Sequence, residues 1–447
     1  MYKSAYLERV FQGVKDANRY EEEFIQAVEE FLSAIDLIVD DEPEIEKLGI
    51  IERIVEPERM ISFRVPWVDD LGRVQVNRGY RVQFNSAIGP YKGGIRFDET
   101  VNQSIMKFLG FEQTFKNALT GLPLGGGKGG ANFNPRGKSD NEIMRFCQSF
   151  MSELYRHIGP NTDVPAGDFG VGAREVGYLF GYYKKLSNEF TSTFTGKGLS
   201  FGGSLLRPEA TGYGLLYFVE ELLHNQKEEN LKGKRVLISG SGNVGSNAAI
   251  KASELGAIVV GMNDISGMIY DEAGLDVELV KKIKDQRETL VNYNLLKPET
   301  IFSSNPKDLW KMACDIALPC AMQNEIDLDD AVNLVNGGIQ VICEGANMPT
   351  TIAATKYFEE HRVIVGPSKA ANAGGVATSG LEMSQNAMRL SWTREEVDAK
   401  LKMIMKDIYH NIYQASERIG KSGNLIVGAN IAGFLKVYEA MKAQGVI

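Results

Sequence analysis

The sequence predicts an α/β protein of two domains. At 447 residues the chain is long enough for two or three domains, each with its own core. Near the N-terminus apolar residues recur at helical spacing, and from Met60 onward they alternate as in β-strands. Further along, short apolar segments alternate with amphipathic ones, which is typical of a parallel sheet covered by helices. We therefore expect one α/β domain over residues 1–204 and a second over 205–425, followed by a helix over 426–447.

Composition and charge exclude several classes of function. The chain is 43% apolar and 24% charged, as in ordinary globular proteins. Its net charge of −9 disfavours nucleic acid or an anionic membrane as the main partner. No segment has the pattern of a leader peptide or of a bilayer-spanning helix. The cysteines and histidines are irregularly spaced, so we expect reduced core thiols, no metal site and a cytoplasmic protein. The cysteines are Cys147, Cys314, Cys320 and Cys343.

The elements expected in the first domain follow from the two periodicities. Apolar residues such as Phe24, Val28 and Phe31 recur at three- and four-residue spacing, which predicts helices with one buried face. The turn signal at Asp69–Gly72 separates two alternating segments, which predicts antiparallel strands. The expected elements are helices within 1–55, strands within 60–84, and helices over 105–119 and 141–157.

The stretch Leu122–Pro135 places Lys128 between two runs of glycine. Glycine loses the most entropy on folding, so a glycine loop suits close approach of the backbone to a ligand better than it suits a core. A lysine held by such a loop away from water has a lowered pKa and can act as a neutral base. From this stretch alone, a surface loop with a solvated lysine is an equal alternative.

Three other segments favour the functional interpretation. Each presents a polar side chain beside glycine or on one face of a helix. They are Lys92 before Gly93, Gln113 and Lys116 three residues apart, and Asp168 after Gly167. Three lysines and one aspartate suit a site that binds a dicarboxylate and moves protons at a reacting group.

The second domain contains a dinucleotide-binding pattern. A short apolar strand at residues 234–239 leads directly into Gly240-Ser-Gly-Asn-Val-Gly245, which opens an amphipathic helix. A second strand follows, and Asp264 stands about 20 residues after the glycines, where such folds place an acidic residue. A plain glycine turn does not explain this spacing. We therefore predict a Rossmann-like NAD(P)-binding domain, with ligand-binding turns at the carboxyl ends of its strands and a cleft between the two domains.

The residues from Leu122 to Pro135 match the active-site signature of the amino-acid dehydrogenases at every position. In that signature an aliphatic residue and two spacers precede Gly-Gly-small-Lys and then Asn/Asp-Pro. Over essentially its whole length the chain resembles the hexameric glutamate dehydrogenases of the Glu/Leu/Phe/Val dehydrogenase family. The resemblance implies a homohexamer assembled through the N-terminal domain, on which the C-terminal helix packs. It also implies an oxidoreductase of amino-acid metabolism and ammonia assimilation, with glutamate, 2-oxoglutarate and ammonium as substrates.

The resemblance also implies roles for individual residues. Lys128 would activate the water or ammonia that reacts at the α-carbon, and Asp168 would hold Lys128 and move the proton of the substrate amino group. Lys92 and Ser379 would bind the side-chain carboxylate. The remaining substrate-binding residues would be Gln113, Lys116, the backbone at Gly93 and Gly167, Arg207 and Val376. The cofactor-binding residues would be Thr211, Gly240, Ser241, Gly242, Asn243, Val244, Gly245, Asn263, Asp264, Asn347 and Asn372, with Asn347 and Asn372 near the nicotinamide.

Two alternative functions compete with glutamate dehydrogenase. Leucine, phenylalanine and valine dehydrogenases share the Lys128 signature but have apolar residues where this chain has Lys92 and Ser379. A lysine facing an aliphatic substrate would be costly, so Lys92 favours glutamate. An inactive nucleotide-sensing scaffold would be expected to lack Lys128 or Asp168, and both are present.

The preference between NADP and NAD is the least decided feature of the sequence. Asp264 suits the ribose 2′-hydroxyl of NAD and would repel a 2′-phosphate. The stretch Gly261–Gly267 nevertheless resembles that of NADP-dependent members, in which the polar residue before the aspartate, here Asn263, bonds the phosphate. Further candidates for phosphate binding are Ser241, Lys282, Lys284 and Lys138. We expect NADP, with NAD or dual use as the alternative.

Overall fold

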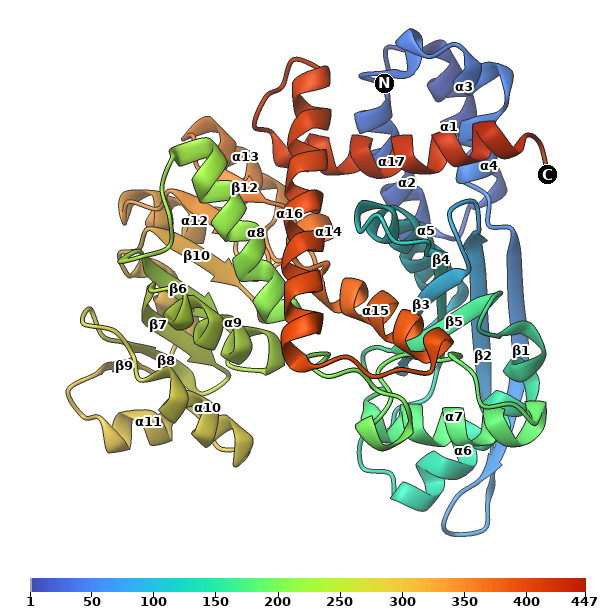
Figure 1. Ribbon diagram of the computed structural model, residues 1–447, viewed down its shortest axis with the longest axis horizontal. Helices are drawn as coiled ribbons and strands as arrows, with labels where there is room; N and C mark the ends of the chain where they lie inside the picture. Colours follow the sequence, from blue (N-terminus) through green and yellow to red (C-terminus); the bar gives the residue numbers. More distant parts are fainter. Residues whose placement is uncertain (1) are drawn as a thin grey trace. The chain divides into compact units, whose positions relative to one another are not determined.

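The computed structural model describes residues 2–447, which form two compact units. Unit 1 runs to Leu205 and also contains Thr378–Val397 and Asn430–Ile447. Unit 2 consists of Leu206–Ala377 and Asp398–Ala429. Both units combine a β-sheet with helices, which confirms the predicted fold class (Figure 1).

Unit 1 is built on a five-stranded mixed sheet of order β1-β2-β4-β3-β5. β1 pairs antiparallel with β2, and β2 with β4, whereas β3 pairs in parallel with both β4 and β5. The carboxyl ends of β3, β4 and β5 therefore lie at one edge of the sheet. The strands are β1 (Arg59–Val68), β2 (Val74–Asn85), β3 (Tyr91–Phe97), β4 (Gly125–Ala131) and β5 (Asp163–Gly167).

Helices form in the three regions of unit 1 where the sequence predicts them, and the helix at Ala173–Ser187 is an addition. The apolar stripe of α2 meets that of α5: the rings of Phe31 and Phe115 stack at 4.5 Å, and Phe434 of α17 lies 5.8 Å from Phe31. The α-helices are α1 (Ala5–Ala17), α2 (Glu22–Ile35), α3 (Glu44–Lys47), α4 (Ile50–Ile54), α5 (Gln103–Leu119), α6 (Asp140–Leu154), α7 (Ala173–Ser187), and the greater part of α15 (Gly374–Met388) and α17 (Leu425–Gln444). Short 3₁₀ turns are η1 (Val39–Asp41), η2 (Tyr155–His157) and η3 (Leu199–Phe201).

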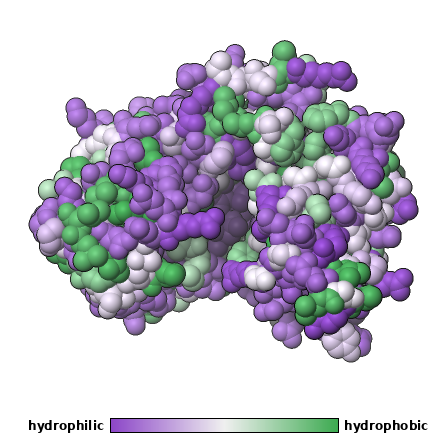
Figure 2. Space-filling model, turned by 90° about the horizontal axis from the view of Figure 1, so that it is seen from below, coloured by the Kyte–Doolittle hydropathy of each residue, from purple (hydrophilic) through white to green (hydrophobic). Residues whose placement is uncertain are grey.

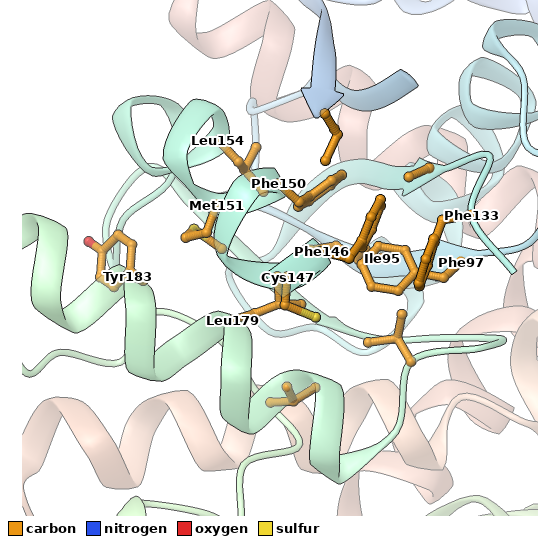
Figure 3. Close-up of a cluster of buried hydrophobic side chains, with 14 of the residues drawn as sticks. Ile95, Phe97, Phe133, Phe146, Cys147, Phe150, Met151, Leu154, Leu179 and Tyr183 are labelled. Carbon is orange, nitrogen blue, oxygen red and sulfur yellow. The ribbon is translucent and has the colours of Figure 1, made fainter. Parts of the chain in front are cut away.

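One face of this sheet is covered by α6 and α7 through an aromatic core (Figure 3). The rings of Phe133 and Phe146 stack at 3.7 Å. Phe97 packs edge to face against both Phe146 and Phe150, and the rings of Phe146 and Phe150 are tilted relative to each other. Aromatic pairs of this kind add about 0.5–1.5 kcal/mol each beyond the burial of their area. This face is therefore a rigid support for the strands that carry polar residues on the other face.

The glycine-rich stretch around Lys128 was expected to be a loop, and this expectation is wrong. Residues Gly125–Ala131 form β4, a fully buried central strand between β2 and β3. The glycines serve close packing, because a Cβ atom on Gly126 would lie only 2.7 Å from the Cα of Thr114 on α5. Ladder hydrogen bonds on both sides compensate for the poor strand propensity of glycine.

Unit 2 contains a seven-stranded sheet of order β12-β11-β10-β6-β7-β8-β9. The five strands from β12 to β7 are parallel, and β8 and β9 are antiparallel. Strand order reverses beside β6, whose neighbours are β7 and β10, and this is the switch point at which doubly wound sheets bind ligands. The strands are β6 (Arg235–Ser239), β7 (Ile258–Asp264), β8 (Gly267–Tyr270), β9 (Ile301–Ser303), β10 (Ile316–Pro319), β11 (Val341–Cys343) and β12 (Ile364–Gly366).

The helices of unit 2 include the final glycine-rich stretch of the sequence. Residues after Pro367 form α14, and Gly374 begins α15, so this stretch is helical. The elements are α8 (Ala210–Lys227), α9 (Asn243–Glu254), α10 (Val277–Asp285), α11 (Val291–Leu296), η4 (Pro306–Lys311), α12 (Leu328–Asn336), α13 (Ile352–Glu360), α14 (Ser368–Ala371) and α16 (Arg394–Arg418).

The segment Thr378–Val397 belongs to unit 1, whereas the predicted boundaries place it in the second domain. The fully buried Glu382 on α15 accepts a hydrogen bond from Lys197 Nζ at 2.8 Å and another from the Gly196 N–H at 2.9 Å. Gln385 donates to Ser204 Oγ at 2.8 Å. These bonds attach α15 to the connector before Leu205, a pairing across more than 180 residues that no local pattern reveals.

The surface and the cysteines have the character expected from the composition of the chain. Hydrophilic residues cover most of the face shown in Figure 2, and apolar patches are scattered between them. All four cysteines are buried and free, as expected for core thiols. Within residues 2–447, no helix is both long and apolar enough to cross a membrane.

Candidate active site

The strands β3 and β4 bring two of the predicted lysines together. Lys92 on β3 stands opposite Gly126 on β4, and Lys128 follows two residues later, so both lysines project from the same face. Helix α5, with Thr114 against Gly126, covers this face. Lys92 is 2% exposed and Lys128 is 6% exposed. Two adjacent strands therefore position the two lysines, although a loop was expected for the Lys128 stretch.

The buried Lys128 forms an ion pair with the partly buried Asp168, as the resemblance implies. Lys128 Nζ lies 2.8 Å from Asp168 Oδ2, and Arg96 Nε donates to the same oxygen at 3.0 Å. Burial lowers the pKa of Lys128, Asp168 opposes this, and the positive charges of Arg96 and Arg81 add to the lowering. Burial alone would raise the pKa of Asp168, but Lys128 and Arg96 outweigh it and bring this pKa to about 2. Asp168 is therefore a carboxylate, beside a lysine that loses its proton more readily than usual.

The turn after β5 presents Asp168 to β3. The Val171 N–H donates to the Asp168 carbonyl at 2.8 Å and closes the turn. Gly94 on β3 leaves room for it, because a Cβ atom there would lie 2.7 Å from the Cβ of Asp168. The predicted glycine turn around Gly167 and Asp168 is thus present, and its strand partner Gly94 is an additional requirement.

Helix α5 adds the residues expected to bind the α-carboxylate. Gln113 and Lys116 lie three positions apart on α5, and the Cγ of Gln113 would be 3.5 Å from a Cβ atom on Gly93. Gln113 donates to Asn117 Oδ1 at 2.7 Å. Asn117 in turn donates to the carbonyls of Lys92 and Gly125, at 3.0 and 2.6 Å. Asn117 therefore ties α5 to both lysine-bearing strands.

A second buried ion pair supports this site from β2. Arg81 and Asp163 are both fully buried, and Arg81 Nε donates to Asp163 Oδ2 at 2.8 Å. Arg81 Nη1 also donates to the Gly93 carbonyl at 3.1 Å, and Gln83 donates to Asp163 at 3.0 Å. Sequence reasoning missed Arg81, Arg96 and Asn117. The strand alternation that puts Arg96 on the face of Lys92 was the one signal that could have indicated it.

The remaining substrate residues divide between the units. Ser379 on α15 is 2% exposed and belongs to unit 1, together with all the residues described above. Arg207 and Val376 belong to unit 2. Within unit 2, a Cβ atom on Gly375 would lie 3.6 Å from an Arg207 guanidinium nitrogen and 2.7 Å from Thr211 Oγ1. The start of α8 and the start of α15 are therefore neighbours.

The glycine turn after β6 has the shape expected of a dinucleotide site. Gly240 has a φ of 72°, and a Cβ atom on Gly245 would collide with the Gly240 carbonyl, so neither position accepts a side chain. Gly242 caps α9, and open space surrounds the position that its Cβ would occupy. Ser241 is 1% exposed, and its hydroxyl has no hydrogen-bond partner in the protein. A buried unsatisfied hydroxyl at a helix N-terminus fits a bound pyrophosphate or ribose.

Other predicted cofactor residues lie around this turn. Asn243, which begins α9 before Val244, donates to the Pro208 carbonyl at 2.6 Å. Thr211 is held near α9, because a Cβ atom on the following Gly212 would lie 2.6 Å from the Ala248 nitrogen. Asn372 donates to Asn347 Oδ1 at 2.8 Å, so the two asparagines expected near the nicotinamide do meet.

Asn263 and Asp264 are engaged differently from the expectation. The Asn263 amide accepts from the Gly240 N–H at 2.7 Å and donates to the Pro306 carbonyl at 3.0 Å. The amide oxygen thus holds the glycine turn, and one of the two amide N–H groups is engaged by Pro306. The second N–H is the donor that a phosphate contact would use. Asp264 accepts from Lys284 Nζ at 2.7 Å, from the Leu290 N–H at 3.1 Å, and from Ser266. Burial would raise the pKa of Asp264, but these bonds to Lys284 and Ser266 lower it.

Comparisons with known proteins agree with both halves of this description. The family model described as Glutamate/Leucine/Phenylalanine/Valine dehydrogenase matches residues 202–445, and the model of the Glu/Leu/Phe/Val dehydrogenase dimerisation domain matches residues 57–185.

Individual relatives match over almost their full lengths. The chain is 55% identical to the NAD-specific glutamate dehydrogenase of Bacteroides fragilis over 445 residues, which cover 99% of this chain and 100% of the relative. It is 54% identical to the NADP-specific glutamate dehydrogenase of Escherichia coli, with 99% of each chain covered. A solved structure of Plasmodium falciparum glutamate dehydrogenase 2 superposes with a TM-score of 0.95 at 50% identity, covering 100% of this chain and 99% of the other. The chain therefore belongs to the glutamate/leucine/phenylalanine/valine dehydrogenase family.

Proposed function

We propose that this protein catalyses the reversible oxidative deamination of L-glutamate to 2-oxoglutarate and ammonia with a nicotinamide cofactor. The observation that carries the proposal is the buried Lys128, paired with Asp168, on the same sheet face as the buried Lys92. A base, a proton acceptor and a separate cation suit an amino acid that carries a second carboxylate. Relatives above 50% identity that are named glutamate dehydrogenases support the same reaction.

The residues divide the work as follows. Lys92 and Ser379 hold the side-chain carboxylate, and Lys116, Gln113 and the backbone at Gly93 and Gly167 hold the α-carboxylate, with Arg207 and Val376 as further substrate residues. These contacts place the α-carbon beside Lys128, whose lowered pKa lets it take a proton from the attacking water or ammonia. Asp168 remains a carboxylate and takes and returns the proton of the amino group. The nicotinamide, when bound, supplies or removes the hydride.

The direct test of this function is the oxidation of reduced nicotinamide in the presence of 2-oxoglutarate and ammonium. We expect activity that requires both substrates. If no oxidation occurs, or if its rate is the same without 2-oxoglutarate and ammonium, the result would favour an inactive nucleotide-binding scaffold.

Substrate choice within the family tests Lys92. We expect Lys92→Leu combined with Ser379→Val to lower kcat/KM for glutamate at least about a thousandfold, because an apolar pocket leaves the substrate carboxylate without partners. The same variant should accept norleucine or methionine. The control is Ser384→Ala, at an exposed position on the same helix, which should keep the original preference. A double variant with the wild-type ratio of glutamate to norleucine would contradict the assignment.

We further propose that NADP is the preferred cofactor, and that Lys284 is the reason. Its ammonium neutralises Asp264 at 2.7 Å, which removes the repulsion that this carboxylate would otherwise exert on a 2′-phosphate. The buried hydroxyl of Ser241 and the cap at Gly242 are suited to the pyrophosphate side. Asn263 acts indirectly in this proposal, by holding Gly240.

This cofactor proposal predicts a selective effect of Lys284→Gln. The ratio of kcat/KM for NADPH to that for NADH should favour NADPH in the wild type and fall about tenfold or more in the variant, since a charge-assisted bond contributes about 1.5–3 kcal/mol. Lys281→Gln, on the same helix, is the matched control and should leave the ratio unchanged, because Lys281 pairs with Asp285 at 2.9 Å instead of with Asp264. A wild-type ratio in favour of NADH would assign the enzyme to NAD instead.

We also propose a homohexamer assembled through unit 1. The match of residues 57–185 to the dimerisation domain supports association through this unit. Sedimentation of the intact protein measures the number of subunits.

A further inference from the structure

One carboxylate oxygen in the candidate active site is shared by two cations. Asp168 Oδ2 lies 2.8 Å from Lys128 Nζ and 3.0 Å from Arg96 Nε. Arginine keeps its proton at any physiological pH, whereas a buried lysine can lose its proton. The negative charge of Asp168 is therefore divided between a permanent cation and the group that must gain and lose a proton.

The strand β3 is built to make this contact. Lys92, Gly94 and Arg96 alternate onto one face, while Ile95 and Phe97 enter the aromatic core on the other. Gly94, between the two cations, lets Asp168 approach to a distance that any side chain would block. Arg96 is 27% exposed at its side chain and Lys128 only 7%, so the arginine occupies the outer side of the carboxylate.

We propose that Arg96 is a positioning residue for catalysis, which orients Asp168 and limits the pull of that carboxylate on the Lys128 ammonium. The inference rests on the proposed function of Lys128 as the base. Without Arg96, Lys128 and Asp168 would form a simple buried ion pair, in which the ammonium is stabilised and the base is withdrawn. With Arg96 present, its positive charge balances the negative charge of Asp168, so the protonated form of Lys128 is stabilised less and the lysine can lose its proton.

The other charged groups around Lys128 cannot replace Arg96. Arg81 of β2 is the other cation that acts on Lys128, and it pairs with Asp163 of β5. The neighbouring elements also carry Lys92 on β3 and Lys116, Glu112 and Lys107 on α5, of which Lys107 pairs with Glu21. Arg81 also lowers the pKa of Lys128, but less than Arg96 does, and its charge is partly compensated by the ion pair with Asp163. Lys92 and Lys116 are the cations assigned to the substrate carboxylates, so substrate binding cancels their charge. Arg96 alone among these cations combines a permanent charge with a direct bond to Asp168.

The sign of the expected pH effect follows from these charges. Burial lowers the pKa of Lys128, Asp168 raises it, and Arg96 lowers it again. Removing the Arg96 charge should therefore raise the pKa of Lys128. On lowering the pH, Lys128 would then become protonated, and the enzyme would lose activity, at a higher pH than in the wild type. A charge at this range shifts a pKa by about one unit or more.

The experiment is the pH profile of kcat/KM for 2-oxoglutarate amination by the intact enzyme at constant ionic strength. In Arg96→Gln the acid limb should move up by about one pH unit, with activity largely recovered at high pH. Arg96→Lys keeps the charge and should keep the limb in place with a lower kcat. The matched control is Arg136→Gln, because this guanidinium lies 5.4 Å from the ring of Phe169, next to Asp168 in the chain, and should not move the limb.

Each outcome decides between a role in protonation and a purely structural role. Equal loss of activity at every pH in Arg96→Gln, or no change, would overturn the proposal. If Arg96→Gln does not fold, a shifted limb in Arg96→Lys overturns it equally, because the charge is retained there. The pH dependence of Lys128 acetylation by acetic anhydride, followed by peptide mass spectrometry, reports the lysine without substrate. A wild type inactive with 2-oxoglutarate and ammonium would instead reject the proposed function.

Discussion

Replacing Lys128 with alanine is expected to lower kcat at least about a hundredfold, the usual weight of a general base. The KM for 2-oxoglutarate should change little, because Lys92 and Lys116 carry the contacts to the two carboxylates. The fold should survive, since Asp168 keeps Arg96 as a partner at 3.0 Å and is not left with an uncompensated charge. Steady-state kinetics with varied 2-oxoglutarate and ammonium measure both quantities, and thermal unfolding checks the fold.

The matched control for this variant is Lys116→Ala on α5. It removes a lysine of the same site that is assigned to substrate binding, so it should raise KM more than it lowers kcat. If Lys128→Ala raised KM alone and kept a kcat near that of the wild type, Lys128 would be a binding residue and the base would have to be sought elsewhere.

Among the substitutions proposed for this protein, breaking the Lys197–Glu382 pair should cause the largest decrease in the free energy of unfolding. Both side chains are fully buried, and Lys197 also donates to the Phe194 carbonyl. Burial lowers the pKa of Lys197, and Glu382 opposes this. Glu382→Ala leaves a buried ammonium without its carboxylate, a change that typically costs about 3–5 kcal/mol. Denaturant unfolding should show a large shift of the midpoint.

The control for Glu382→Ala is Glu46→Ala, which breaks the exposed Arg9–Glu46 pair of the same unit and should cost less than about 1 kcal/mol. Because Ser379 lies one helical turn before Glu382, Glu382→Ala should also raise the KM for glutamate. An unfolding midpoint equal to that of Glu46→Ala would contradict the structural role of this pair.

Patterns that are local in the chain were sufficient for much of the fold. Helical spacing around Phe24 and Phe31, alternation from Met60 and the Gly240–Gly245 turn each depend on neighbours a few residues apart, and each predicted the correct element. The signature from Leu122 to Pro135 indicated the family, and the resemblance to that family implied that Asp168 is the partner of Lys128.

The secondary structure of the Lys128 stretch depended on tertiary structure. Glycine has a low strand propensity, so the stretch reads as a loop. It is a strand because β2 and β3 supply hydrogen bonds on both sides and α5 packs against Gly126. Those partners lie in other segments of the chain, and no local pattern contains them.

The contacts of the residues that support the site also depended on tertiary structure. Arg96 reaches Asp168 across 72 residues, and Arg81 reaches Asp163 across 82. The resemblance predicts Asn263 as a phosphate ligand, and only the tertiary structure shows that its amide also holds Gly240 and contacts Pro306. The sequence by itself determined which residue types this protein can use for chemistry. Only the register of β3, β4 and β5 decided which charges share one carboxylate, because that register brings together strands far apart in the chain.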